Sequence, residues 1–189
     1  MIKKIVLFIS ICLLALPAFC AEYVSADGSI KVTATNLSVT KTAIKASGNV
    51  ILVSKTNGNN ARVTCDSIKV VPLNDKNLSK GLTSAKEAVF TGNINFTFSV
   101  NGENKTNYSG TADSAYYDGI TQLLTMKGDV KIEYQDENTD KSNRMIATGE
   151  KAVLNLKETP DDDDVIFSIE GENKRAKIDI DPQIFEDNL

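Results

Sequence analysis

A regular alternation of apolar and polar residues is the feature that most constrains the fold of this chain. It is clearest in the stretch VKIEY (residues 130–134), where apolar and charged side chains alternate strictly. A period of two places successive side chains on opposite faces of a β-strand, so such strands have one dry face and one wet face. Helical patterns are nearly absent after residue 20, and we therefore predict an all-β protein.

Two kinds of segment alternate along the chain as an internal repeat. One kind has a small residue, usually followed by an acid, and then alternating apolar positions; its copies start at Ala26, Cys65, Ala112 and Gly149. The other kind has a Gly, a polar residue and a strand; its copies start at Gly48, Gly92, Gly128 and, in degraded form, Gly171. Each repeat is expected to form a hairpin.

Hairpin turns are predicted at Asn-Gly and Asp-Gly steps, which favour the tight turns that connect antiparallel strands. These steps are Asp27-Gly28, Asn57-Gly58, Asn101-Gly102 and Asp118-Gly119. After the last of them we expect two separate strands, Leu123 to Met126 and Val130 to Tyr134. The expected irregular regions are the polar loops Lys55 to Arg62 and Asn101 to Asn107, and Leu78 to Ala88, a loop leading into a strand.

The N-terminus has the pattern of a secretory signal peptide. Lys3 and Lys4 precede an apolar run from Ile5 to Leu16, and small residues follow Pro17, so cleavage is expected after Cys20. The run is shorter than the ~20 residues of a membrane span. Retention of Ile5 to Leu16 as an anchor and lipidation at Cys20 are the alternatives. The mature domain is expected to cover residues 21–180.

The composition excludes several classes of function. Removal of the leader leaves 19 basic residues against 25 acidic ones, a net charge of −6, which argues against nucleic-acid binding. The chain has no His, and this removes His-based general bases, Ser-His-Asp triads and His-ligated zinc. We expect no enzyme activity and no cofactor. Cys65 would be the one cysteine of the mature chain, and we interpret it as a small strand residue.

Acidic residues cluster from Asp161 to Asp164, after Pro160. Carboxylates are suitable ligands for calcium, but consecutive aspartates on a strand point to alternating sides, and a solvated loop is the interpretation that we prefer. We therefore expect no metal site. The tail of residues 181–189 is expected to leave the domain at Pro182.

The dry faces of the strands allow two interpretations. They form either the packed core of an ordinary sandwich or the lining of a long open trough that its own side chains do not fill. The alternation of residues does not distinguish between the two, because both require the same register.

The order and spacing of the repeated segments resemble the OstA-like family, in particular the LptA-type proteins of lipopolysaccharide transport. The segments that carry this resemblance are residues Ala46–Val53, Cys65–Pro72, Lys86–Phe90, Ser109–Tyr117, Leu124–Val130 and Gly149–Ala152. The chain departs from the family pattern in the acidic run at residues 161–164 and in its segment Gly171 to Ile180.

The resemblance implies a single open, twisted antiparallel β-jellyroll with an apolar interior groove for the acyl chains of lipopolysaccharide. It implies a periplasmic protein that carries lipopolysaccharide from the inner to the outer membrane. The expected lipid-binding residues are Val50, Leu52, Ile68, Val70, Phe90, Ile94, Phe96, Phe98, Tyr117, Leu124, Met126, Val130 and Ile132.

The same resemblance implies edge-to-edge β-pairing with an inner-membrane LptC-like protein and an outer-membrane LptD-like protein, or head-to-tail pairing of copies. Val24 to Val32 and Arg175 to Ile180 are the expected edge segments. Two alternatives remain: an LptC-like component anchored by Ile5 to Leu16, and a structural β-protein without a lipid ligand.

Overall fold

The computed structural model describes residues 20–56, 59–73, 85–101, 105–136, 143–156, 167–172 and 175–180. Within these ranges it contains no helix long and apolar enough to cross a membrane. Six features predicted from the sequence lie wholly or partly outside them: the signal peptide before Cys20, the Asn57-Gly58 turn, residues 78–84 of the predicted loop Leu78 to Ala88, Gly102 of the Asn101-Gly102 turn, the acidic run at 161–164 and the tail at 181–189. The rest of the predicted loop, Ala85 to Ala88, is not a loop but the start of a strand.

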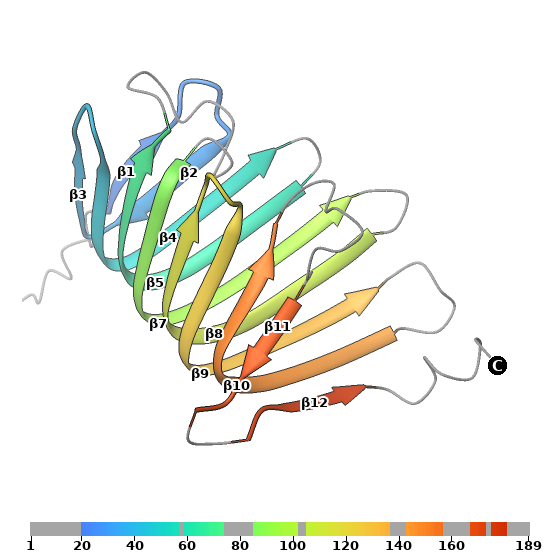
Figure 1. Ribbon diagram of the computed structural model, residues 1–189. Helices are drawn as coiled ribbons and strands as arrows, with labels where there is room; N and C mark the ends of the chain where they lie inside the picture. Colours follow the sequence, from blue (N-terminus) through green and yellow to red (C-terminus); the bar gives the residue numbers. More distant parts are fainter. Residues whose placement is uncertain are drawn as a thin grey trace, which may run out of the picture.

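The described residues form one antiparallel sheet of eleven strands (Figure 1). The strands are β1 (Ala21–Val24), β2 (Ile30–Ala34), β3 (Asn36–Val39), β4 (Ile44–Thr56), β5 (Asn59–Pro72), β7 (Ala85–Asn101), β8 (Lys105–Asp118), β9 (Leu123–Asp136), β10 (Asn143–Asn155), β11 (Phe167–Glu170) and β12 (Lys177–Ile180). The main path is β1-β2-β4-β5-β7-β8-β9-β10-β11, with β3 on β4 and β12 on β10. This architecture confirms the prediction of an open antiparallel β-jellyroll.

Each long strand bends sharply near its middle, and the bends lie side by side across the sheet (Figure 1). We call the two halves arm 1, which includes Ile44–Ser47 and Ala85–Thr91, and arm 2, which includes Val50–Thr56 and Ile94–Asn101. The register shifts between the arms in every pairing of the long strands. Such β-bulges bend a strand and increase its twist, so the aligned bends fold the sheet on itself. We call the inner faces of the two arms the trough.

Glycines with positive φ make the bends possible. Gly92 has φ +74° and the following Asn93 has φ +49°, a left-handed conformation that costs a residue with a Cβ about 1–2 kcal/mol. The Asp66 carboxylate of the neighbouring bend lies against Gly92 and accepts a hydrogen bond of 2.9 Å from Asn93 Nδ2. Gly128 lies against Asp113 in the same way. The two repeated sequence patterns therefore meet at the bends of adjacent strands.

The bends correct several predicted boundaries. Residues 123–126 and 130–134 are not separate strands but the two arms of β9, because the bulge at Gly128 bends the strand without ending it. Most of the predicted loop Lys55 to Arg62 is strand, since Lys55 pairs with Asn60 and Thr56 with Asn59 in the β4–β5 hairpin. The strand also continues into the predicted loop at 101–107, where Ser99 pairs with Asn107.

Two of the predicted turns are described in full. Gly28, with φ +71°, lies in the turn between β1 and β2, where its N–H donates to the Ser25 carbonyl at 2.8 Å. At the β8–β9 turn, the Asp118 carboxylate accepts a hydrogen bond from the N–H of Ile120 at 2.8 Å. Aspartate side chains of this kind replace missing backbone partners and favour turns.

The edges of the sheet differ from the prediction at the N-terminal end. β2 lies inside the sheet, between β1 and β4, so only the β1 part of Val24 to Val32 is an edge. At the same N-terminal end of the sheet, β3 is the edge strand of arm 1, because it pairs with Ile44–Ser47 of β4. At the C-terminal end, β11 pairs with arm 1 of β10 and β12 with arm 2. The segment Arg175 to Ile180 thus includes an edge strand, as predicted.

Candidate functional site

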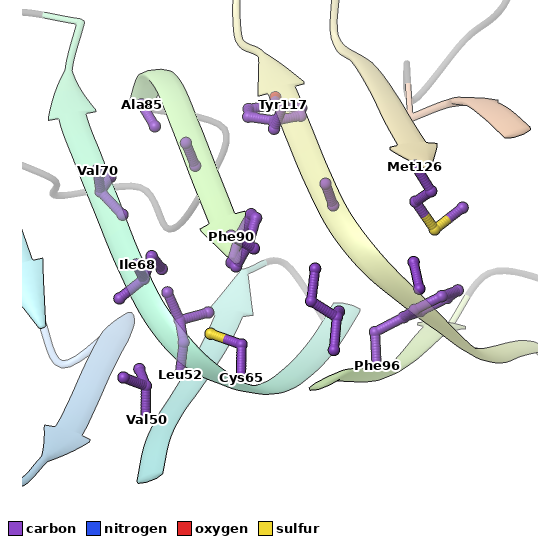
Figure 2. Close-up of a cluster of buried hydrophobic side chains, with 14 of the residues drawn as sticks. Val50, Leu52, Cys65, Ile68, Val70, Ala85, Phe90, Phe96, Tyr117 and Met126 are labelled. Atoms are coloured by element: carbon purple, nitrogen blue, oxygen red, sulfur yellow. The ribbon is translucent and has the colours of Figure 1, made fainter. Parts of the chain in front are cut away.

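The candidate site is the interior of the trough, where apolar side chains from both arms form one hydrophobic cluster (Figure 2). Ile68 and Phe90 pair directly across β5 and β7 in arm 1, and Val63 and Phe96 pair across the same strands in arm 2. Because residues that pair directly point to the same face, each such row adds apolar surface to the interior.

The predicted register is confirmed on the strand that tests it best. In β7, Ile94 and Phe96 are buried, whereas Asn95 and Thr97 are exposed. Eleven of the thirteen expected lining residues are buried in the cluster, and Phe98 and Leu124 are partly buried. The buried eleven are Val50, Leu52, Ile68, Val70, Phe90, Ile94, Phe96, Tyr117, Met126, Val130 and Ile132.

Small residues complete the interior, and the sequence reasoning did not assign them to the lining. Phe90 pairs with Ala115, and Phe96 pairs with Gly110, where a Cβ would lie 2.7 Å from the Phe96 ring. A large side chain thus lies beside a small one on the neighbouring strand. Position on the dry face of a strand could have identified the buried alanines of the strands, which are Ala34, Ala46, Ala85, Ala88, Ala112, Ala115, Ala147 and Ala152.

A row of three aromatic side chains lies on the inner face of arm 2, at the end of the arm that is farthest from the bends. The ring centroids of Phe98 and Tyr108 are 6.3 Å apart, and those of Tyr108 and Tyr134 are 5.3 Å apart in an edge-to-face arrangement. All three side chains are only partly buried. Paired aromatic rings of this kind stabilise a surface while leaving part of it open to a ligand.

The C-terminal end of the trough has partly exposed apolar side chains in both arms. Ile169 pairs with buried Ala152 in arm 1, and Ile178 pairs with buried Ala147 in arm 2, so both isoleucines lie on the inner face. Ile169 is partly buried, and Ile178 is 49% exposed. We call this end the C-terminal mouth.

Two titratable groups inside the trough, Cys65 and Tyr117, are held neutral. Burial raises the pKa of the Cys65 thiol to about 11, and the thiol donates a hydrogen bond to the Ser67 carbonyl at 3.2 Å. A raised pKa makes a cysteine unreactive, as we expected for a small strand residue. Burial, and to a lesser extent the charge of Asp118, also raises the pKa of Tyr117.

The interior therefore presents apolar surface without an unmatched polar group. Among the described residues, every buried side-chain N or O atom has a hydrogen-bond partner. The ion pairs, such as Glu133–Arg144 at 2.7 Å, involve side chains at the surface. Such an arrangement suits a hydrocarbon ligand, because a hydrocarbon chain needs no hydrogen-bond partner.

These features define a class of β-protein in which bent antiparallel strands fold around an apolar interior. The structure is similar to that of LptH from Pseudomonas aeruginosa, described as the LptA homologous periplasmic component of the conserved lipopolysaccharide transport device. The TM-score is 0.54 and the identity 12%, over 80% of this chain and 92% of LptH. No protein-family model and no curated protein matches the sequence. The likeness is one of fold.

Proposed function

We propose that this protein is a periplasmic carrier that holds the acyl chains of lipopolysaccharide in its trough during transport from the inner to the outer membrane. The observation that carries the proposal is the apolar interior, which is open at the C-terminal mouth, in a fold shared with LptH. The signal peptide expected at residues 1–20 supports export to the periplasm.

The geometry suggests where a lipid would lie. Side chains near the bends, such as Met126 and Val130, are already buried by their neighbours, whereas the aromatic row and the C-terminal mouth are partly open. Each buried methylene contributes about 0.8 kcal/mol, so a few methylenes on these open surfaces are enough for useful affinity. Contacts deeper in the trough require the arms to move apart.

The edges support a role in a bridge. Among the described residues, β1 at one end of arm 2 and β12 at the other each pair with a single strand. Free strand edges readily pair with another chain. In the proposed bridge, one end of the trough joins an inner-membrane LptC-like protein and the other an outer-membrane LptD-like protein, directly or through further copies.

The degree of burial favours one other function, that of a structural β-protein without a lipid ligand. Ile30, Val32 and Met126 are at most 1% exposed, so much of the interior is filled by the protein itself. A scaffold of this kind would carry no lipid through purification.

Photocrosslinking separates the two functions. A photoreactive amino acid at Phe96 would point into the trough, and the same amino acid at Thr97, the matched control, would point outward. The proposal predicts lipopolysaccharide adducts in cells from position 96 and none from position 97. Adducts from neither position, in a folded and exported protein, would refute lipid carriage and support the scaffold.

Mass spectrometry of the exported chain tests the remaining alternative, an LptC-like component held in the membrane by Ile5 to Leu16. A chain that begins at Ala21 agrees with the proposed soluble carrier. A chain that keeps the residues before Ala21 would replace it with the anchored component.

A further inference from the structure

A second concave surface lies on the outer face of arm 1, opposite the trough. It is an open groove of about 410 Å³ across β3, β4, β5 and β7. Its walls are two rows of directly paired residues, and Leu37, Ala46 and Ile68 of the row between them also line it. One row is Asn36, Ser47, Ser67 and Thr91, and the other is Ser38, Lys45, Lys69 and Val89.

The chemistry of the two rows differs. The first row offers three hydroxyl groups and an amide, which both donate and accept hydrogen bonds. The second row places Lys45 and Lys69 on directly paired positions of β4 and β5. Hydroxyls beside a pair of cations are suited to an oxyanion attached to a polar, hydroxylated body.

The lysine pair is neutralised only in part within the described part of the protein. Lys69 forms an ion pair with Glu87 at 3.0 Å, whereas no described side chain forms an ion pair with the ammonium group of Lys45. Like charges directly opposed on a sheet are destabilising. A bound anion would remove this repulsion, so the groove gains more from an anion than from a neutral molecule.

The size of the groove indicates a ligand larger than a free anion. Small-molecule sites measure about 300–1,000 Å³, whereas a single water occupies about 30 Å³ in the liquid. An inorganic phosphate would contact the lysines and leave the row from Asn36 to Thr91 unused. A sugar that carries a phosphate can contact both rows.

We propose that this outer groove binds a phosphorylated sugar, with Lys45 and Lys69 on the phosphate and the hydroxyl row on the sugar. This site is separate from the apolar trough, because its side chains lie on the opposite face of the same strands. The proposal therefore does not depend on lipid carriage.

The chain contains its own control for non-specific charge attraction. Lys127 and Lys151 are also directly opposed on the outer face of arm 1, and Lys151 forms an ion pair with Glu170 at 2.9 Å. Lys127, like Lys45, has no ionic partner among the described residues. Neither lysine of this pair lines the groove.

The test is calorimetric titration of the mature protein, its Lys45→Gln variant and its Lys127→Gln variant with glucose 1-phosphate, inorganic phosphate and glucose. We expect Lys45→Gln to weaken glucose 1-phosphate binding about tenfold or more, the loss typical of one charge-assisted hydrogen bond. Lys127→Gln should change it less than about twofold. Glucose and inorganic phosphate should each bind more weakly than the ester.

Three results would overturn the proposal: no binding of glucose 1-phosphate, equal weakening by both substitutions, or inorganic phosphate binding as tightly as the ester. Both lysines are exposed, so folding should be retained, and circular dichroism checks this. Crosslinking from Phe96 in the Lys45→Gln variant separates the two proposals, because the variant should lose sugar phosphate binding and keep any lipid adducts.

Discussion

Replacing Gly92 with alanine tests whether contacts between neighbouring bends stabilise the trough. At φ +74°, an alanine would cost about 1–2 kcal/mol from the backbone alone. Its Cβ would also lie 2.9 Å from Cγ and 3.0 Å from Cβ of Asp66, and closer still to one carboxylate oxygen. Overpacking of this kind typically costs a further 1–3 kcal/mol, roughly. We therefore expect Gly92→Ala to lower the free energy of unfolding by about 2–5 kcal/mol.

Gly28 provides the matched control. Its φ of +71° is nearly the same as that of Gly92, but a Cβ there would meet no atom within 4 Å. Gly28→Ala should therefore show the backbone cost of about 1–2 kcal/mol without the clash. The difference between the two variants measures the contact with Asp66.

Chemical denaturation with urea, fitted with the m-value as a check on two-state unfolding, gives the required free energies. The double variant Asp66→Ala/Gly92→Ala removes the carboxylate from the clash and should recover at least about 1 kcal/mol relative to the sum of the single effects. The reasoning is wrong if Gly92→Ala is no more destabilising than Gly28→Ala, or if the two effects in the double variant simply add.

Two further predictions concern pH. Folding raises the pKa of Cys65 from 9.0 to about 11, so the contribution of this thiol to stability is fully present below pH 9 and is lost as the pH rises through 11. The free energy of unfolding should therefore fall less over this pH range in Cys65→Ala than in the wild type. Equal pH dependence in the two proteins would contradict the raised pKa. A hydrogen bond from Arg144 lowers the pKa of Glu133, so Arg144→Gln should raise it toward 4.5, as measured by NMR titration, and an unchanged value would show that the ion pair is absent in solution.

The faces of the strands could be predicted from the sequence, but the continuity of the strands could not. Alternation around Phe96 fixes which residues are buried, because a slip by one residue would expose the whole apolar set. The sequence of a Gly followed by a polar residue is the same whether a strand ends there in a hairpin turn or continues through a bend. Gly128 was therefore interpreted as the end of one strand, although it joins the two arms of β9.

The bends also change the alternation in a way that local patterns do not reveal. In β7 the buried residues on the two sides of the bend, Phe90 and Ile94, are four apart, so the alternation continues; in β5 they are Cys65 and Ile68, three apart, so it shifts by one residue. The extra residue belongs to the bulge. Pairing of the acid in one repeat with the glycine of the next, as in Asp66 and Gly92, depends on the sheet and was not predicted.

The candidate trough was found from its large apolar residues, and the outer groove was missed. Lys45 and Lys69 are 24 positions apart and are brought together only by the β4–β5 register. Their sequence contexts are those of ordinary wet-face lysines. A register derived from the β4–β5 hairpin and carried through the bulge at Gly48 would have been needed to place them opposite each other.

The alignment of the bends has a consequence for the dimensions of the protein. Neighbouring strands are about 4.8 Å apart, so each additional hairpin would lengthen the trough by about 10 Å and leave its width unchanged. The nine strands of the main path correspond to a length of about 40 Å. Duplication or loss of a hairpin would therefore change how far one chain reaches, while the place of the bend within each strand sets the depth of each arm.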